Sequence, residues 1–122
     1  MDSSSPNIRS YNFVDKEQIL ELLRLNTPNY FAIEEEKDLL CYLNSEVELY
    51  YVVELDNKIV GCGGINFENN KSIGKISWDI IHPDYQGKSI GSTLLKHRID
   101  LLLTMKSIGK LPRFNSNLLA YF

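Results

Sequence analysis

Hydrophobic residues recur at three- and four-residue intervals in three stretches of the chain, and this spacing predicts three amphipathic helices. The first follows Asp15, which suits an N-cap, and the Asn26-Thr27-Pro28-Asn29 segment ends it. The second covers 34–43, and the third ends at Gly109-Lys110. The apolar positions of the three helices are Ile19, Leu22, Leu23 and Leu25; Leu39, Leu40 and Leu43; and Leu94, Leu95, Ile99, Leu101, Leu102, Leu103 and Met105.

Runs of β-branched and aromatic residues predict four strands, at 7–12, 49–55, 59–67 and 75–81. The Asp56-Asn57-Lys58 segment between the second and third runs is a hairpin signal. The last three of these runs predict three antiparallel strands, and with the loop and long helix that follow they predict an α+β fold.

Glycine and proline residues mark irregularities and ends of these strands. Gly61, Gly63 and Gly64 predict a β-bulge or a close approach of another backbone in the third strand. The Asn69-Asn70-Lys71 segment turns the chain toward the fourth strand. Pro83 ends that strand, because proline cannot donate a hydrogen bond to a sheet ladder.

The composition suits one small globular domain. The chain has 122 residues, 43% of them hydrophobic, and a formal net charge of −3. We expect a disordered polar tail at 1–6 and a single domain at 7–122. The charge balance disfavours a nucleic-acid or anionic-membrane partner, and no apolar run reaches membrane-spanning length. The start of the chain does not resemble a signal peptide, so a cytoplasmic location is expected.

The two cysteines, Cys41 and Cys62, lie far apart in the chain and have no metal-binding spacing. We therefore expect two buried thiols and no bound metal. A nucleophilic cysteine is the alternative.

The segment 82–92 joins the fourth strand to the third helix, and its residue types suit phosphate binding. The first turn of a helix leaves N–H groups without partners, and the helix dipole adds partial positive charge there. Gly87 and Gly91 permit close approach to the backbone, Lys88 adds a cation, and Ser89 adds a hydroxyl donor. We predict an anion site here. An ordinary strand-to-helix connection with capping serines is the alternative.

Two common phosphate loops do not match this segment. The mononucleotide P-loop requires glycine where His82 stands, and the dinucleotide fingerprint requires glycine where Ser89 stands. The run Gln86-Gly87-Lys88-Ser89-Ile90-Gly91 instead resembles the Gln/Arg-x-x-Gly-x-Gly/Ala acyl-CoA loop of the GNAT superfamily of N-acyltransferases. The preceding His82-Pro83-Asp84-Tyr85 resembles the turn that often comes before that loop. Ser89 departs from the pattern, because the family usually has glycine there.

The resemblance covers nearly all of the chain and implies a GNAT-like mixed sheet flanked by helices. Its strands one to four would be antiparallel, and a parallel fifth strand would splay away from the fourth. It also implies acetyl-CoA as the cosubstrate, with the pantetheine arm in the gap between these two strands. The residues implied in CoA binding are Ile80, Ile81, Gln86, Gly87, Lys88, Ser89, Ile90, Gly91, Ser92 and, through an Asn-x-x-Ala match, Asn117.

The resemblance further implies an N-acetyltransferase in which a primary amine attacks the thioester directly, with no metal. A strand amide near Ile81 is the candidate for polarising the carbonyl, and Asp79, on the same face of the strand, is the candidate base. The alternative role for Asp79 is a strand-end side chain hydrogen-bonded to a turn. We expect Trp78 in the core, His82 in a turn and His97 on the solvated side of its helix.

The acidic run Glu34-Glu35-Glu36 has two interpretations. Acidic residues near a helix start compensate the helix dipole, which is the simpler one. The first helices of the family line the acceptor site, so the run could instead form an acidic lip for an amine. The acceptor could be a small molecule or a peptide, and the sequence does not distinguish them.

The end of the chain fits the resemblance less well than the rest. A fifth strand is predicted at 111–115 despite Pro112, and the sequence stops at Phe122, before the final helix, tyrosine and strands of the family. We therefore expect an incomplete domain with an open sheet edge, which favours a homo-oligomer. The alternative function is a degenerate domain of this fold that binds CoA weakly or acts through oligomer contacts.

Overall fold

A mixed sheet forms the centre of the structure, a computed structural model that describes residues 5–68, 73–107 and 113–114. The strand order is β1-β2-β3-β4-β5, and the first four strands are antiparallel, as predicted. The strands are β1 (Asn7–Ser10), β2 (Leu49–Leu55), β3 (Lys58–Glu68), β4 (Ile73–Ile81) and β5 (Arg113–Phe114). The two residues of β5 pair in parallel with Ile73 and Gly74 at the start of β4.

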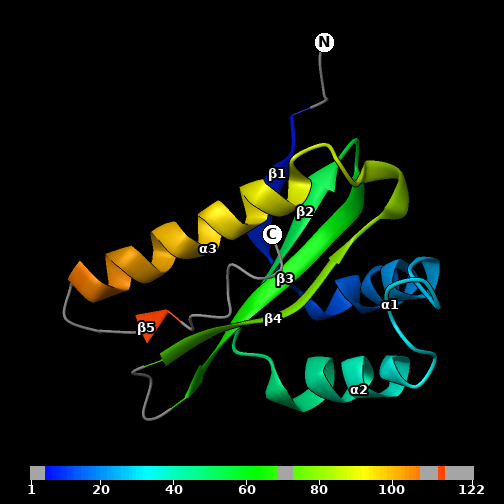
Figure 1. Ribbon diagram of the computed structural model, residues 1–122, viewed down its shortest axis with the longest axis horizontal. Coiled ribbons are helices and arrows are strands. Elements are labelled where there is room, and N and C mark those ends of the chain that lie inside the picture. The colour runs from blue at the N-terminus through cyan, green and yellow to red at the C-terminus, as the bar shows by residue number, and fades with distance from the viewer. Residues whose placement is uncertain (1–4, 69–72, 108–112, 115–122) are drawn as a thin grey trace.

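The helices lie on both faces of this sheet (Figure 1). They are α1 (Lys16–Leu25), α2 (Glu35–Cys41) and α3 (Ile90–Ser107), with short turns η1 (Phe13–Asp15), η2 (Tyr42–Glu46) and η3 (Pro83–Tyr85). Helices α1 and α2 cover one face and α3 crosses the other. The predicted α+β fold with three helices is therefore confirmed. None of the helices within the described residues is long and apolar enough to cross a membrane.

The core has one apolar cluster on each face of the sheet, because successive side chains of a strand point to opposite sides. In β2, Tyr50 and Val52 pack toward α1 and α2, whereas Tyr51 and Val53 pack toward α3. The cluster on the first face also contains Ile19, Leu20, Leu22, Leu23, Leu39, Tyr42, Leu43, Ile59, Cys62 and Ile80. The cluster on the second face also contains Val60, Ile90 and Leu94.

Two leucines that were expected to face the core are exposed. Leu25 is 43% exposed and Leu40 is 38% exposed. Helical residues advance by about 100°, so Leu25 lies roughly 140° from the centre of the buried face of α1. Leu20 is buried in its place, and Tyr42 takes the inward position that was assigned to Leu40.

The start of α1 differs from the simple N-cap that was predicted at Asp15. Asp15 does precede the helix, but its side chain makes no capping bond to α1. It instead accepts the backbone N–H of Asn12 at 2.8 Å and two hydrogen bonds from Arg9 at 2.9 Å. The Asn12 side chain in turn accepts from Val14, so the capping box belongs to η1.

The turn between β2 and β3 is the predicted hairpin. Asp56 and Asn57 have φ angles of 52° and 64°, the left-handed pair that a type I′ turn requires. Three other predictions fall outside the described residues: the 69–71 turn, the helix end at Gly109-Lys110, and Asn117. The fifth strand predicted at 111–115 is described only at its two β5 residues.

The predicted irregularity near the β3 glycines is a β-bulge. Gly64 pairs with Ser77 and Cys62 pairs with Ile80, so Gly63 faces two residues of β4, Trp78 and Asp79. Trp78 has a φ of 49°, which is unusual for a residue with a side chain. A Cβ atom at Gly63 would lie 2.5 Å from Asp79 Oδ1, so glycine leaves the room that this bulge needs.

Candidate functional site

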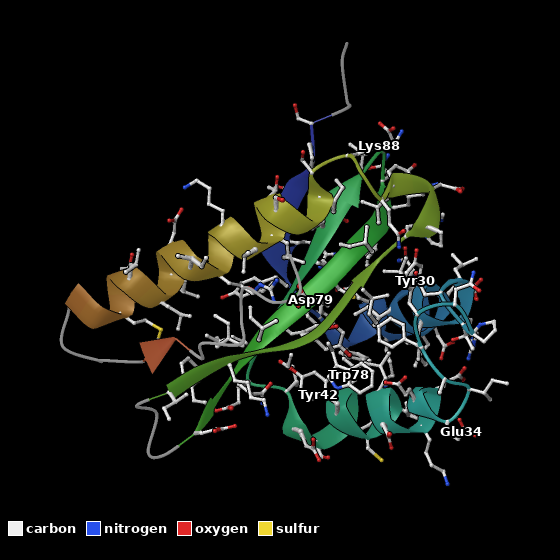
Figure 2. The ribbon with its side chains drawn as sticks, in the orientation of Figure 1. Tyr30, Glu34, Tyr42, Trp78, Asp79 and Lys88 are labelled. Carbon is white, nitrogen blue, oxygen red and sulfur yellow. The ribbon has the colours of Figure 1, made fainter. Side chains whose placement is uncertain are left out.

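A cleft of about 570 Å³ runs beside the second half of β4. Three segments form it: the connection from α1 to α2, the strand itself, and the loop that follows η3. Its lining residues are Asn26, Tyr30, Phe31, Glu35, Ile76, Trp78, Asp79, Ile81 and Gln86. Figure 2 shows Tyr30 on the α1–α2 connection, Trp78 turned toward α2, and Asp79 turned toward α3.

The turn at the end of β4 is built from local hydrogen bonds. His82 N–H donates to the Val60 carbonyl at 2.8 Å, which is the last sheet bond of the strand. The His82 side chain accepts the N–H of Asp84 through Nδ1 at 3.1 Å. His82 is therefore the turn residue that the sequence indicated, and Pro83 begins η3 immediately after it.

The loop from Gln86 to the start of α3 presents a run of backbone N–H groups. Gly87 and Ser89 have left-handed φ angles of 77° and 67°. The Gln86 N–H lies 3.5 Å from the Pro83 carbonyl, and the Thr93 N–H makes the first helical bond, to Ser89 at 3.0 Å. The amides of 87–92 make no short, well-aligned hydrogen bond to a backbone acceptor within the described part of the chain. This is the arrangement of an anion site at a helix N-terminus.

Cations lie beside this loop. Lys58 Nζ and Lys88 Nζ approach the Tyr85 ring to 5.2 and 5.9 Å from its centroid. Figure 2 places Lys88 at the end of the loop, away from the α1–α2 connection. The two ammonium groups add positive potential next to the exposed amides, which favours a ligand that carries phosphate groups.

Asn26 joins three elements at the end of the cleft. Its side chain is buried and donates from Nδ2 to the carbonyls of Leu22 at 2.8 Å and Ile81 at 3.0 Å. Its Oδ1 accepts from Gln86 Nε2 at 3.3 Å. The sequence indicated only a helix breaker here, because Asn26 is separated by 55 residues from Ile81 and by 60 from Gln86.

Asp79 forms an ion pair with Arg98 of α3. Oδ1 and Oδ2 accept from Nη1 and Nη2, each at 2.6 Å, and Arg98 also donates to the carbonyls of Leu94 and Gly64. The Arg98 side chain is fully buried, and 19% of the Asp79 side chain is exposed. Burial raises the pKa of the Asp79 carboxyl above its usual value, and the Arg98 hydrogen bonds oppose this rise. The hydrogen-bond partner of Asp79 is thus a helix residue, not the turn considered from the sequence.

Aromatic side chains form the opposite side of the cleft. The rings of Phe31 and Trp78 are stacked, with centroids 6.3 Å apart and an interplanar angle of 18°. Tyr42 packs behind Trp78, and its hydroxyl hydrogen-bonds Asn66 and Ser77. Burial raises the pKa of the Tyr42 hydroxyl to about 12. Trp78 therefore packs on the core, as expected, and also lines the cleft.

The three acidic residues that were considered together separate in the structure. Glu36 binds Arg24 through both oxygens, at 3.0 and 2.8 Å. Glu35 lines the cleft and accepts the Ala32 N–H at 2.8 Å. Glu34 is exposed, and Figure 2 places it at the start of α2. Only one of the three glutamates therefore lines the cleft.

Two further expectations from the sequence are wrong. Cys41 is exposed, while Cys62 is buried and has its thiol pKa raised to about 12 by burial. His97 is half-buried, with its ring edge-on to Tyr51 at 4.8 Å, and does not lie on a solvated face. Across the described residues there is no cluster of three or more His, Cys, Asp or Glu side chains that could hold a metal ion.

The comparison with protein families matches residues 16–121 to the acetyltransferase (GNAT) family. Among curated proteins, the amino-acid acetyltransferase of Buchnera aphidicola subsp. Schizaphis graminum is 29% identical over 93 residues, which are 76% of this chain and 20% of that protein. That of Proteus mirabilis is 26% identical over 108 residues, which are 88% of this chain and 23% of that protein. The chain thus spans about a fifth of the length of these relatives.

Solved structures share the fold. A proposed acetyltransferase from Pyrococcus horikoshii has a TM-score of 0.70 and 25% identity, over 96% of this chain and 84% of that one. A GNAT family acetyltransferase from Brucella melitensis, in complex with acetyl-CoA, has a TM-score of 0.70 and 18% identity, over 87% and 71%. The N-acetylglutamate synthase of Neisseria gonorrhoeae, complexed with coenzyme A and N-acetyl-glutamate, has a TM-score of 0.67 and 21% identity, over 93% and 25%.

Proposed function

This chain belongs to the GNAT acetyltransferase family, and we propose that it transfers an acetyl group from acetyl-CoA to a primary amine by direct attack on the thioester. The observation that supports this most strongly is the run of N–H groups at 87–92, which make no short, well-aligned hydrogen bond to a backbone acceptor among the described residues and stand at the start of α3 beside an open cleft. A diphosphate satisfies such amides and is favoured by the helix dipole.

The cosubstrate would lie along β4 and the loop. The amides from Gly87 to Ser92, with Lys88, would hold the pyrophosphate, while the Gln86 amide contributes less because it points to Pro83. The pantetheine arm would lie along Ile80 and Ile81 and pair with the backbone of Ile81, because the backbone groups of Ile80 face Cys62 of β3. We further propose that the arm lies in a gap between β4 and a splayed fifth strand, and that Asn117 contacts CoA.

Strand geometry favours Ile81 as the group that polarises the carbonyl. The His82 N–H points to β3, where it bonds Val60. Because successive residues of a strand direct their amides to opposite sides, the Ile81 N–H points to the other edge of β4, toward the cleft. An N–H fixed at this place stabilises the negative charge that develops on the thioester oxygen during attack.

The transfer itself forms one bond and breaks one. The amine nitrogen attacks the thioester carbon, the new C–N bond forms, the C–S bond breaks, and CoA leaves as the thiolate. The nitrogen loses a proton, and we propose the Asp79 carboxylate as the acceptor of that proton. Burial raises the pKa of this carboxyl above its ordinary value, which makes the carboxylate a stronger base, although the Arg98 hydrogen bonds oppose the rise.

The alternative is a domain that binds CoA without turnover, and one observation favours it. Both carboxylate oxygens of Asp79 already accept hydrogen bonds from Arg98, so protonation of Asp79 would weaken a buried ion pair. Within the described residues, β5 pairs only with Ile73 and Gly74 of β4. The remaining edge would therefore be available to CoA or to a second copy of the chain, which is why we keep self-association as an expectation.

Calorimetry with acetyl-CoA and a thiol-release assay with a panel of primary amines would test the proposal. The assay should use a Cys41→Ser background, because exposed Cys41 would react with the thiol reagent. We expect binding and amine-dependent thiol release. Absence of binding at millimolar acetyl-CoA would overturn the proposal, and binding without release from any amine would establish the alternative.

Lys88→Ala and Lys96→Ala are a matched pair for the same experiment. Lys88 lies in the loop, whereas exposed Lys96 pairs with Asp100 further along α3. We expect Lys88→Ala to weaken acetyl-CoA binding by about three- to fivefold, the effect of one exposed charge contact. Lys96→Ala should leave the affinity unchanged.

A further inference from the structure

We infer that this cleft prefers, as its acceptor, a cationic amine that has an aromatic or aliphatic body and lacks a carboxylate. An α-amino acid would be a poor acceptor. The inference deepens the proposed function and rests on it, because it assigns the α1–α2 side of the cleft to the acceptor. It is carried by three features of the lining: an apolar wall, an excess of carboxylates, and the absence of an available cation among the described lining residues.

The wall accepts an apolar body. Phe31 and Trp78 present stacked rings, and Tyr30 stands beside them on the α1–α2 connection (Figure 2). Ile76 and Ile81 extend this surface along β4. Flat rings and methylene chains pack well on such a surface, and an ammonium group near the aromatic faces gains cation–π attraction.

The charged groups of the lining are both acidic. They are Glu35 and Asp79, and none of the described lining residues is lysine, arginine or histidine. Glu35 is held in place by the Ala32 N–H, which occupies Oε2. Arg98 balances the charge of Asp79, so Glu35 supplies the negative charge that favours an ammonium ion, and a substrate carboxylate would meet like charge there.

The arginines of α1 and α3 are paired with carboxylates. Arg98 lies behind Asp79, is fully buried, and gives its donors to Asp79, Gly64 and Leu94. Arg24 is paired with Glu36. The described lining therefore has no free guanidinium group that could bind the α-carboxylate of an amino acid through two hydrogen bonds. The curated relatives at 25–29% identity are named amino-acid acetyltransferases, so the inference gives this chain a different acceptor class.

Three ligands that differ at one substituent test this inference: phenethylamine, L-phenylalanine and L-phenylalaninamide. All carry the same benzyl group and a primary amine, only phenylalanine carries a carboxylate, and the amide keeps its bulk without the charge. Binding can be read without turnover, because Trp78 is the only tryptophan of the chain and lines the cleft. Fluorescence titrations, with and without saturating CoA, give the three dissociation constants.

We expect phenethylamine and phenylalaninamide to bind at least about tenfold more tightly than phenylalanine. Glu35→Gln should weaken phenethylamine binding by about three- to fivefold, while Glu34→Gln, an equal change of charge outside the cleft, should not. Equal dissociation constants for all three ligands would overturn the inference, and so would phenylalaninamide binding as weakly as phenylalanine. The inference would also fail if none of the three ligands quenched Trp78 fluorescence.

Thiol release from acetyl-CoA in the same samples separates this inference from the proposed function. Release that is faster with phenylalanine than with phenethylamine would preserve the acetyltransferase and refute the acceptor class. Quenching of Trp78 by phenethylamine without any release would refute the acetyltransferase and leave the ligand preference of the cleft standing.

Discussion

The carboxylate of Asp79 and the guanidinium of Arg98 meet through two parallel hydrogen bonds of 2.6 Å, directly behind the bulge of β4. Gly63 provides the space for this pair, because a side chain there would collide with both partners. The pair ties the middle of α3 to the strand that borders the cleft. The helix α3 begins at the 86–92 loop. This one buried contact therefore fixes the position of that loop relative to the cleft beside β4.

Arg98→Met should therefore destabilise the protein by about 3–5 kcal/mol, because it leaves the carboxylate of Asp79 buried without its partner. The Asp79→Asn/Arg98→Met double variant should lose less stability than the sum of the two single variants. Urea denaturation of the four proteins measures this coupling.

Arg24→Met is the matched control for this prediction. Arg24 also binds a carboxylate through two hydrogen bonds, but its pair with Glu36 is exposed. We expect its free energy of unfolding to stay close to that of the unaltered protein. Equal losses for Arg98→Met and Arg24→Met would show that burial of the first pair carries no energetic weight.

Ser89 occupies a backbone conformation that suits glycine. Its φ of 67° is left-handed, so Ser89→Gly should stabilise the protein by about 0.5–1 kcal/mol, after the greater entropy of an unfolded glycine is allowed for. Gly87→Ala should have the opposite effect, a loss of about 1 kcal/mol, for conformational reasons alone, because a Cβ there meets nothing within 4 Å. The midpoint temperatures of thermal unfolding compare the variants. A lower midpoint for Ser89→Gly than for the unaltered protein would show that the backbone at Ser89 is not strained.

Asp15 gives the protein part of its resistance to acid. Hydrogen bonds from Arg9 lower the pKa of the Asp15 carboxyl below its unfolded value, and burial opposes this shift. The stabilisation is thus present above the unfolded pKa of about 4 and is lost as the pH falls through the folded pKa. Asp15→Asn should cost about 1–3 kcal/mol at pH 7 and progressively less below pH 4. A pH-independent difference between the two proteins would contradict this account.

The two cysteines should differ sharply in reactivity. Burial raises the pKa of the Cys62 thiol to about 12, and Tyr50 donates a hydrogen bond to its sulfur at 3.3 Å. At pH 8 an aromatic disulfide reagent should therefore titrate one thiol, Cys41, in the folded protein and both thiols in guanidinium. Rapid reaction of two thiols in the folded state would show that the core around Cys62 opens readily.

Much of the fold could be predicted from local patterns. Strands β2 and β4, the turn at Asp56-Asn57, the bulge near Gly63 and the loop before α3 all follow from residue type and spacing within one segment. The errors at Leu25 and Leu40 have a common origin. A helical pattern gives the period of the apolar face, but the direction of its centre depends on which neighbour the helix meets.

The candidate site was predicted where one segment supplies the chemistry, and missed where several segments meet. Asn26 was predicted only as part of a helix-breaking segment, and Arg98 had no predicted role. Glu35 could not be distinguished from Glu34 and Glu36, since the choice among them is made by how α2 packs against α1.

The amino-acid sequence by itself determined the types of the elements, their order and the position of the glycine-containing loop before α3, because backbone geometry fixes side-chain direction and helix ends within a few residues. Only the tertiary structure decided that Arg98 holds Asp79, that Asn26 holds Ile81 and Gln86, and that one glutamate borders the cleft. These contacts join residues on different elements, and their geometry exists only after the helices have packed on the sheet.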